Sequence, residues 1–264
     1  MSNSSDIKNQ PVGVIDSGIG GLTVLRELVD LCPNEQYIYI GDDINSPYGQ
    51  RDVEDIQTLS LLLCKRPLLS HIKTLVIACN TITAAAMDVI KEHCKFPVIG
   101  VIDSGVQECI NVTKNNKVGI LATNATVDSK VFDKELKKIN KDIEVTSVGA
   151  PNMHLYAENS LDLVMNDPTP QIKQCVKDYV TPFMDAGCDT ILLACTHFPP
   201  FEYLIREVVG DKVSIVSPSK LTALEFKNVL EKNGMSSNGP GSYKIYSTAH
   251  NEFKYEKFQE LIMK

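Results

Sequence analysis

Two cysteines, Cys79 and Cys195, stand in nearly the same local sequence, which reads KTLVIACNT at 73–81 and DTILLACTH at 189–197. In both segments a threonine precedes four apolar residues ending in alanine, and the cysteine is followed by two polar or titratable residues. The pKa of a thiol, near 8.5, lies closer to neutrality than that of a carboxyl or lysine side chain, and neighbouring groups readily change it. Two such thiols on opposite sides of a bound molecule could invert a stereocentre, because one thiolate removes a proton and the other thiol returns one to the opposite face.

The other six cysteines are expected to be small hydrophobic core residues, as buried free cysteines usually are. They are Cys32, Cys64, Cys94, Cys109, Cys175 and Cys188. The sequence contains no CxxC pair, and Cys188 is expected at the far end of a strand from Cys195, so a structural zinc site formed by Cys188, Cys195 and His197 is not expected. We predict no bound metal, no cofactor, and free thiols in a reducing cytoplasm.

The two cysteine segments belong to a chain in which short apolar runs alternate with longer helical patterns. The runs lack strict polar alternation, which is typical of strands covered on both faces of a parallel sheet. The predicted strands are 12–16, 37–42, 74–79, 98–103, 117–122, 143–149, 190–195 and 213–218. The predicted helices include 21–31, 53–65, 81–93, 128–139, 170–186 and 219–233, with Gly187 and Gly234 where helix stops are expected. This order predicts an α/β fold whose reactive groups gather beyond the carboxyl ends of parallel strands.

The chain also contains a weak internal repeat. VGVIDSG at 12–18 resembles VGILATN at 118–124. At a comparable distance after each of these segments comes a predicted strand that ends in Cys79 or Cys195. We therefore predict two related α/β lobes, residues 1–103 with 216–264 and residues 104–215. A second GVIDSG at 100–105 falls near the predicted lobe junction, and we assign it no catalytic role. A helix is expected to follow each cysteine, and its N-terminus would favour a thiolate.

Further polar residues follow the predicted strands. Asp16 and Ser17 open DSGIGG at 16–21, whose glycines let backbone N–H groups approach a ligand. The segment lacks the full G-x-G-x-x-G spacing of a dinucleotide loop, so a carboxylate-binding turn is favoured.

Hydroxyl, amide and imidazole groups complete the candidate set. The residues beside the thiols that could bind a carboxylate are Asn80, Thr81 and Thr196, and a threonine there could equally cap a helix. His197, two residues after Cys195, could hold charge or move a proton. His71, His93, His154 and His250 are interpreted as incidental. The turn SPYGQR at 46–51 is either a surface loop or part of the site.

The composition limits the classes of function. The chain has 264 residues, 43% apolar and 22% charged, with a net charge of −7, and acidic and basic residues are interspersed. Without a basic stripe, neither nucleic acid nor an anionic membrane is expected as a partner. The sequence shows no apolar stretch that could span a bilayer, and its polar start, MSNSSDIKNQ, does not resemble a signal peptide, so we expect a cytoplasmic protein.

Five motifs in order resemble the glutamate racemases, in the cofactor-independent Asp/Glu racemase superfamily. They are GVIDSGIGGLTVLREL, YIGDDINSPYGQR, LVIACNTITAAA, VGILATNATV and DTILLACTHFPP. The resemblance implies two Rossmann-like lobes related by pseudo-twofold symmetry, with the active site in the cleft between them. It also implies interconversion of L- and D-glutamate, supply of D-glutamate for peptidoglycan synthesis, and a homodimer.

The resemblance further implies roles for individual residues. Cys79 corresponds to the base acting on the D-enantiomer and Cys195 to the base acting on the L-enantiomer, while Asp16 and His197 correspond to their assisting groups. Glu158, in the segment APNMHLYAEN, matches an acidic position on the Cys195 side. The substrate-binding positions are Asp16, Ser17, Pro47, Tyr48, Gly49, Cys79, Asn80, Thr81, Thr123, Cys195, Thr196 and His197.

Three other interpretations of the sequence stay open. The chain could racemise aspartate or a broader range of amino acids, although His197 after the second Cys-Thr favours glutamate. It could bind an amino acid on the same fold without catalysis. It could also be a thiol redox protein, in which Cys79 and Cys195 would form a disulfide in a working state.

Overall fold

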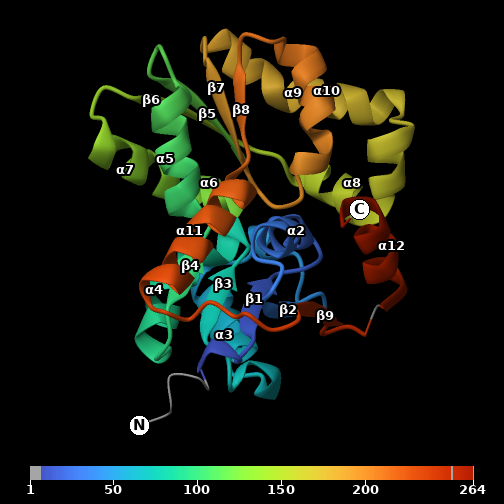
Figure 1. Cartoon of the computed structure of the whole chain (residues 1–264). Coiled ribbons are helices and arrows are strands. Elements are labelled where there is room, and N and C mark those ends of the chain that lie inside the picture. The colour runs from blue at the N-terminus through green and yellow to red at the C-terminus, as the bar shows by residue number, and fades with distance from the viewer. Residues whose placement is uncertain (1–6, 251, 264) are drawn as a thin grey trace. The chain divides into compact units, whose positions relative to one another are not determined.

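Short Val-, Ile- and Leu-rich segments form two parallel sheets in the computed structural model, which describes residues 7–250 and 252–263 (Figure 1). The chain divides into two compact units: unit 1 is Met1–Val101 with Ser219–Lys264, and unit 2 is Ile102–Pro218. In the part of the chain that the structure describes, no helix has the length and apolar character needed to cross a membrane.

The sheet of unit 1 has the strand order β4-β3-β1-β2-β9. Its strands are β1 (Val12–Asp16), β2 (Gln36–Gly41), β3 (Thr74–Ile77), β4 (Val98–Gly100) and β9 (Ser242–Ser247). Every residue of the central strands β1 and β3 is buried, as their unbroken apolar sequences predict.

The sheet of unit 2 has the strand order β6-β5-β7-β8. Its strands are β5 (Lys117–Ala122), β6 (Glu144–Gly149), β7 (Thr190–Ala194) and β8 (Ser214–Val216). All of β7 is buried, whereas the edge strand β6 is largely half-buried. The two cysteine strands are therefore central in their respective sheets.

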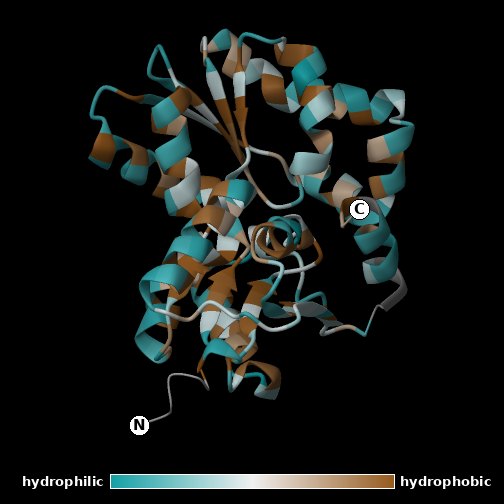
Figure 2. Cartoon of the chain, in the orientation of Figure 1, coloured by the Kyte–Doolittle hydropathy of each residue, from teal (hydrophilic) through white to brown (hydrophobic). Residues whose placement is uncertain are grey.

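Helices connect the parallel strands of each unit. Unit 1 contains α2 (Leu22–Leu31), α3 (Val53–Cys64), α4 (Asn80–His93), α11 (Pro218–Lys232) for all but its first residue, and α12 (Glu252–Ile262). Unit 2 contains α5 (Ile102–Val112), α6 (Asn124–Ser129), α7 (Val131–Ile139), α8 (Pro151–Asn166), α9 (Pro170–Asp185) and α10 (Glu202–Val209). Short 3-10 helices are η1 (Tyr48–Gln50), η2 (Pro67–Leu69) and η3 (Pro199–Phe201). Many helices carry both apolar and polar residues (Figure 2); α2, for example, buries Leu22, Leu25 and Leu28 at helical spacing.

The structure corrects the sequence prediction in several places. The predicted strand 98–103 ends at Gly100, and α5 begins at Ile102 because Ile102, Val106 and Cys109 bury one helical face. The predicted helix 128–139 is two helices, α6 and α7, separated at Lys130, whose backbone is left-handed (φ 54°). The sequence pattern predicts neither the strand β9, which is a half-exposed edge strand, nor the helices α8, α10 and α12. Gly187 and Gly234 do follow helices and adopt φ of 71° and 63°, as helix stops require.

A buried ion pair and its hydrogen bonds join four separate segments of unit 1. Lys73, which precedes β3, pairs with Glu35, and both side chains are almost fully buried. Lys73 Nζ also donates to the carbonyls of Lys8 and Met235, each at 2.8 Å, while Glu35 accepts from the Ser237 N–H at 2.8 Å. The pair thus fixes the chain before β1 and the loop after α11 against the amino end of the sheet.

Breaking this pair on one side is expected to destabilise the protein. Lys73→Met leaves the Glu35 charge buried without its cation, so the free energy of unfolding should fall by about 3–5 kcal/mol. The midpoint of urea denaturation measures the loss. Lys91→Met, at an exposed position, is the control and should change the midpoint little. An equally small change in Lys73→Met would contradict a structural role for the pair.

Candidate active site

The point where strand order reverses in each sheet carries the candidate residues. In unit 1 the chain passes from β1 to β2 on one side and later places β3 on the other side of β1. In unit 2, β5 leads to β6 on one side, and β7 lies on the other side of β5. Open α/β sheets bind ligands beyond the carboxyl ends of strands at such reversal points. Cys79 follows β3 and Cys195 follows β7, so each lies at the reversal point of its own sheet.

Strand register brings Ser17 and Cys79 together in unit 1. Ile15 pairs with Ile77, and Ser17 and Cys79 lie two residues beyond that pair. The Ser17 Oγ is 3.4 Å from the Cys79 Sγ, and Cys79 is the residue immediately before α4. Asp16 is buried and its Oδ1 accepts from the Gly18 N–H at 2.9 Å. The structure therefore places a thiol, a hydroxyl and a carboxylate at one strand end.

The surroundings of Cys79 favour the neutral thiol. Burial raises the pKa of Cys79 to about 12, and the negative charge of Asp16 acts in the same direction. Hydrogen bonds from the Ser17 hydroxyl and from the backbone N–H groups of Ile82 and Ser17 oppose this rise. Cys79 is thus held as a proton donor until another group takes up its proton.

Asn80, the next residue, has a buried amide without a hydrogen bond. The residue is 2% exposed, and neither its Nδ2 nor its Oδ1 has a partner among the described residues. Burying an amide without hydrogen bonds is unfavourable by about 1–3 kcal/mol. An unpaired amide beside a thiol is therefore a natural place for the polar atoms of a ligand.

One glycine of DSGIGG serves the fold. A Cβ at Gly21 would lie 2.7 Å from the Cβ of Asp16, 2.8 Å from the Tyr39 hydroxyl and 2.9 Å from the Cβ of Ala78. Gly21 precedes α2, so its missing side chain lets that helix begin close to the ends of β1, β2 and β3. This glycine is explained by packing.

The segment Pro47–Gly49 is anchored through the side chain of Tyr48. Tyr48 is fully buried, and its hydroxyl donates to Asp42 Oδ2 at 2.6 Å. The Thr248 hydroxyl donates to Asp42 Oδ1 at 2.8 Å, and η1 contacts α4. Because the Tyr48 hydroxyl is already engaged, this segment could reach a ligand through its backbone groups.

In unit 2, register brings Thr123 and Cys195 to adjacent strand ends. Ala122 pairs with Ala194, and Thr123 and Cys195 are the next residues of their strands. The Thr123 Oγ1 caps α6 by accepting from the Thr126 N–H at 3.4 Å. Thr196 is buried beside Cys195, and Thr81 is buried in the first turn of α4.

The expectation of a helix directly after each cysteine is correct for Cys79 and wrong for Cys195. After Cys195 the chain makes a turn, in which the Phe198 N–H donates to the Cys195 carbonyl at 3.0 Å, and α10 begins only at Glu202. The prolines of 199–200 shape this turn and η3. A thiolate on Cys195 must therefore be stabilised by something other than a helix N-terminus.

The side chain of His197 lies beside the Cys195 thiol. Its Nδ1 is 3.8 Å from the Cys195 Sγ, and its Nε2 is 2.6 Å from Glu158 Oε1. Both His197 and the Glu158 side chain are largely buried. A thiol, an imidazole and a carboxylate thus form a hydrogen-bonded chain within unit 2, in which the carboxylate orients the ring.

The pKa of His197 reflects this chain. Burial opposes the imidazolium, but the hydrogen bonds to Cys195 and Glu158 and their negative charges outweigh burial and raise the pKa of His197 to about 10. An imidazolium at neutral pH stabilises a thiolate beside it. The two cysteines therefore have partners of opposite charge: Asp16 near Cys79 and His197 near Cys195.

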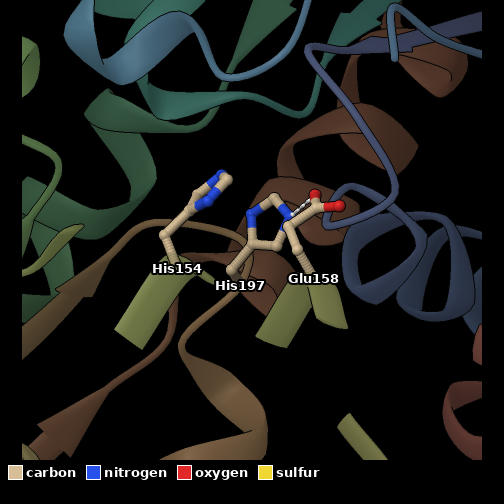
Figure 3. A group of neighbouring side chains, drawn as sticks. All are labelled: His154, Glu158 and His197. Atoms are coloured by element: carbon tan, nitrogen blue, oxygen red, sulfur yellow. Dashed lines mark hydrogen bonds and ion pairs between the residues drawn. The ribbon is translucent and has the colours of Figure 1, made fainter. Parts of the chain in front are cut away.

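The structure adds one residue that the sequence analysis treated as incidental. His154 is buried and its ring lies against that of His197, with ring centroids 4.1 Å apart and an interplanar angle of 41° (Figure 3). His154 and Glu158 are four residues apart on α8, so they share one helix face and lie on either side of the His197 ring. Their spacing could have indicated this had 151–166 been predicted as a helix.

Among the described residues, the side chains that could together bind a metal ion are not Cys188, Cys195 and His197, the group considered from the sequence. His154, Glu158 and His197 each offer a ligand atom, and these atoms lie within 4.8 Å of one another. Cys188 precedes β7 and Cys195 follows it, so these two cysteines lie at opposite ends of that strand, as predicted.

Comparison with known proteins gives consistent results. Residues 12–242 match the Asp/Glu/Hydantoin racemase family. A glutamate racemase from Lactobacillus acidophilus is 36% identical over 256 residues, 97% of this chain and 94% of the relative. A glutamate racemase from Staphylococcus carnosus is 39% identical over 225 residues, 84% of this chain and 82% of the relative.

Solved structures resemble the chain over nearly its whole length. Glutamate racemase isoform RacE1 from Bacillus anthracis has a TM-score of 0.90 at 33% identity and covers 96% of this chain, which covers 94% of it. Glutamate racemase from Francisella tularensis, solved in complex with D-glutamate, has a TM-score of 0.88 at 31% identity, with 97% and 94% covered. These likenesses confirm the α/β fold class predicted from the sequence.

Proposed function

Because the chain belongs to the Asp/Glu/Hydantoin racemase family, we propose that it interconverts L- and D-glutamate, with Cys79 and Cys195 acting on opposite faces of the α-carbon. Family membership confirms the resemblance predicted from the five motifs, and the relatives described above are named glutamate racemases. One observation carries the proposed chemistry. Each sheet brings one cysteine to its reversal point, and each cysteine has its own charged partner.

In the proposed reaction, the Cys195 thiolate, paired with the His197 imidazolium, removes the α-proton of L-glutamate. The neutral Cys79 thiol donates its proton to the opposite face of the carbanion, which gives D-glutamate. Cys79 is then the thiolate and Cys195 the thiol, and proton exchange with water restores the starting state. In the reverse direction the same groups exchange roles, as microscopic reversibility requires.

The carbanion must be stabilised without a bound cofactor in this mechanism. The unpaired amide of Asn80 and the hydroxyls of Ser17 and Thr81 supply polar groups from unit 1. Thr123 and Thr196 supply hydroxyls from unit 2. Preorganised groups of this kind stabilise developing charge most strongly where water is excluded. Supply of D-glutamate for peptidoglycan synthesis and a homodimer stay predictions from the resemblance. A cytoplasmic location stays a prediction from the composition and the polar start of the sequence.

Isotope exchange tests the proposed activity directly. In D₂O, without added cofactor, L-glutamate should lose optical rotation and gain deuterium at its α-carbon. The D-glutamate formed should carry deuterium at that position, because the donated proton comes from a thiol equilibrated with solvent. Mass spectrometry after separation of the enantiomers measures both quantities.

The same experiment separates the alternatives. Exchange on L-aspartate that exceeds exchange on L-glutamate would favour an aspartate racemase, and binding of glutamate without exchange would favour a binding protein. All eight cysteines, each within the described residues, are free thiols. A redox protein would instead show a Cys79–Cys195 disulfide when its thiols are titrated in the working state.

A further inference from the structure

We propose that His154, Glu158 and His197 form a binding site for a divalent transition metal ion such as Zn²⁺, and that the bound ion inhibits the enzyme. The site is the group of side chains shown in Figure 3. Binding of the ion is independent of the proposed racemase activity, whereas the inhibition rests on that activity.

The ligand atoms of the three residues lie close together. One ligand atom from each residue lies within 4.8 Å of the other two. In a tetrahedral zinc site with bonds of about 2.0–2.2 Å, ligand atoms are about 3.4 Å apart. To reach that separation, the side chains must rotate so that the 2.6 Å contact between His197 Nε2 and Glu158 Oε1 lengthens and the longer separations shorten.

Burial and helix geometry favour a defined site. His154 is 7% exposed and His197 is 2% exposed, and the Glu158 side chain is 9% exposed. His154 and Glu158 are presented by successive turns of α8, while His197 comes from the turn after β7. Two elements of unit 2 thus hold the three ligands, and three protein ligands leave a fourth position for water.

The donor set selects among metals. Imidazole nitrogens suit Zn²⁺, Co²⁺ and Ni²⁺, whereas Mg²⁺ and Ca²⁺ prefer oxygen ligands alone. Two imidazoles and one carboxylate should therefore bind Zn²⁺ and Co²⁺ and discriminate against Mg²⁺.

Metal binding would move the His197 ring. The Nε2···Oε1 contact of 2.6 Å between His197 and Glu158 orients this ring so that its Nδ1 lies 3.8 Å from the Cys195 Sγ. An ion ligated by both groups replaces that direct contact and sets the two ligand atoms about 3.4 Å apart. Because the ring turns with its ligand atom, Nδ1 leaves its position beside the thiol that the proposed reaction uses.

Calorimetric titration of the full-length protein with Zn²⁺ tests the site. Wild-type protein should bind one Zn²⁺ ion. The His154→Gln and His154→Phe variants should bind that ion about 100-fold more weakly than wild type, or not at all. Phenylalanine keeps a ring against His197 but has no ligand atom, so it separates packing from coordination. His93→Gln, on the exposed end of α4, is the matched control and should bind as wild type does.

Titration with Co²⁺ distinguishes this site from binding to cysteines. Subtracting the Co²⁺ spectrum of a His154 variant from that of wild type gives the absorption of the proposed site. This difference spectrum should lack the near-ultraviolet absorption that thiolate ligands give to Co²⁺. Unchanged Zn²⁺ stoichiometry and affinity in both His154 variants, with both folded by circular dichroism, would overturn the proposal. Thiolate absorption in the difference between the wild-type and His154-variant spectra would also overturn the proposal.

Inhibition is measured separately. Zn²⁺ should lower the racemisation rate at least tenfold in wild type and in His93→Gln. In each His154 variant, the rates with and without Zn²⁺ should be nearly equal. Zn²⁺ binding without any racemisation would refute the proposed function and leave the site intact. Racemisation that is insensitive to Zn²⁺ at saturation would refute the inhibition.

Discussion

Cys79→Ala and Cys195→Ala should each lower kcat/KM for racemisation by about 10³-fold or more, since each removes a group that transfers a proton in the reaction. Both directions should fall by the same factor in each variant. L- and D-glutamate have equal free energies in water, so the equilibrium constant is one, and kcat/KM must be equal in the two directions. Circular dichroism of the substrate, followed from each enantiomer, measures both rates.

A third cysteine supplies the control. Cys188 is as buried as Cys195 and lies at the other end of β7. Cys188→Ala should lower stability slightly and keep turnover within about threefold of wild type, because it only shortens a core side chain. If Cys188→Ala lost as much activity as Cys195→Ala, the loss would reflect damage to the fold, and the assignment of the two bases would fail.

Solvent exchange can show which thiol serves which enantiomer. In Cys79→Ala, Cys195 can still remove and return the α-proton of L-glutamate, so deuterium should enter L-glutamate without inversion. In Cys195→Ala, deuterium should enter D-glutamate. The opposite pattern would reverse the assignment of the two faces, which comes from the family resemblance.

His197→Gln should lower kcat/KM by about 10²–10⁴-fold, because glutamine cannot carry the charge that stabilises a Cys195 thiolate. Glu158→Gln should act through the pH dependence. The Glu158 carboxylate raises the pKa of His197, so its removal lowers that pKa from about 10. Imidazolium is lost as pH rises through the pKa of His197, and the alkaline limb of kcat/KM should therefore move to lower pH.

The pH profile separates this electrostatic role from a structural one. Asp162 is an exposed acidic residue on the same helix, α8, so Asp162→Asn is the control and should leave the alkaline limb where it is in wild type. An alkaline limb that is unchanged in Glu158→Gln would contradict the coupling between Glu158 and His197. A uniform loss of activity at all pH values would indicate that Glu158 only positions the ring.

The positions of the two cysteines could be predicted from sequence because parallel strands leave few possibilities. A buried apolar run that ends in polar residues places those residues at the carboxyl edge of its sheet, and β3 and β7 do so. The spacing of the duplicated segments also anticipates the register, since Thr74 and Thr190 occupy equivalent places opposite Val12 and Val118.

The hexapeptide GVIDSG shows the limit of local sequence. At 13–18 it completes β1 and forms the turn beside Cys79, whereas at 100–105 it ends β4 and begins α5. The same six residues adopt two structures because contacts with the rest of the protein determine their secondary structure. The strand β1 is central in its sheet, whereas β4 is an edge strand.

The part of the site on α8 was missed for a related reason. The sequence indicates Glu158 only through the family resemblance and gives His154 no role, because APNMHLYAEN does not show the periodic pattern of a helix. Pro151 stands at the first turn of this helix, where proline is tolerated, and the chain is again non-helical at Ser160. A helix that starts with proline and is kinked at Ser160 gives a weak periodic pattern.

The unpaired amide of Asn80 has a consequence for ligand choice. Its Nδ2 is a donor and its Oδ1 an acceptor, and both lack partners among the described residues. An α-amino acid offers a carboxylate to the first and an ammonium group to the second. A keto acid or a plain dicarboxylate brings only acceptors, and it leaves the amide oxygen buried without a donor, at a penalty of about 1–3 kcal/mol. The Asn80 amide would therefore disfavour binding of ligands that lack the amino group, while it accepts both the L- and the D-enantiomer of an amino acid.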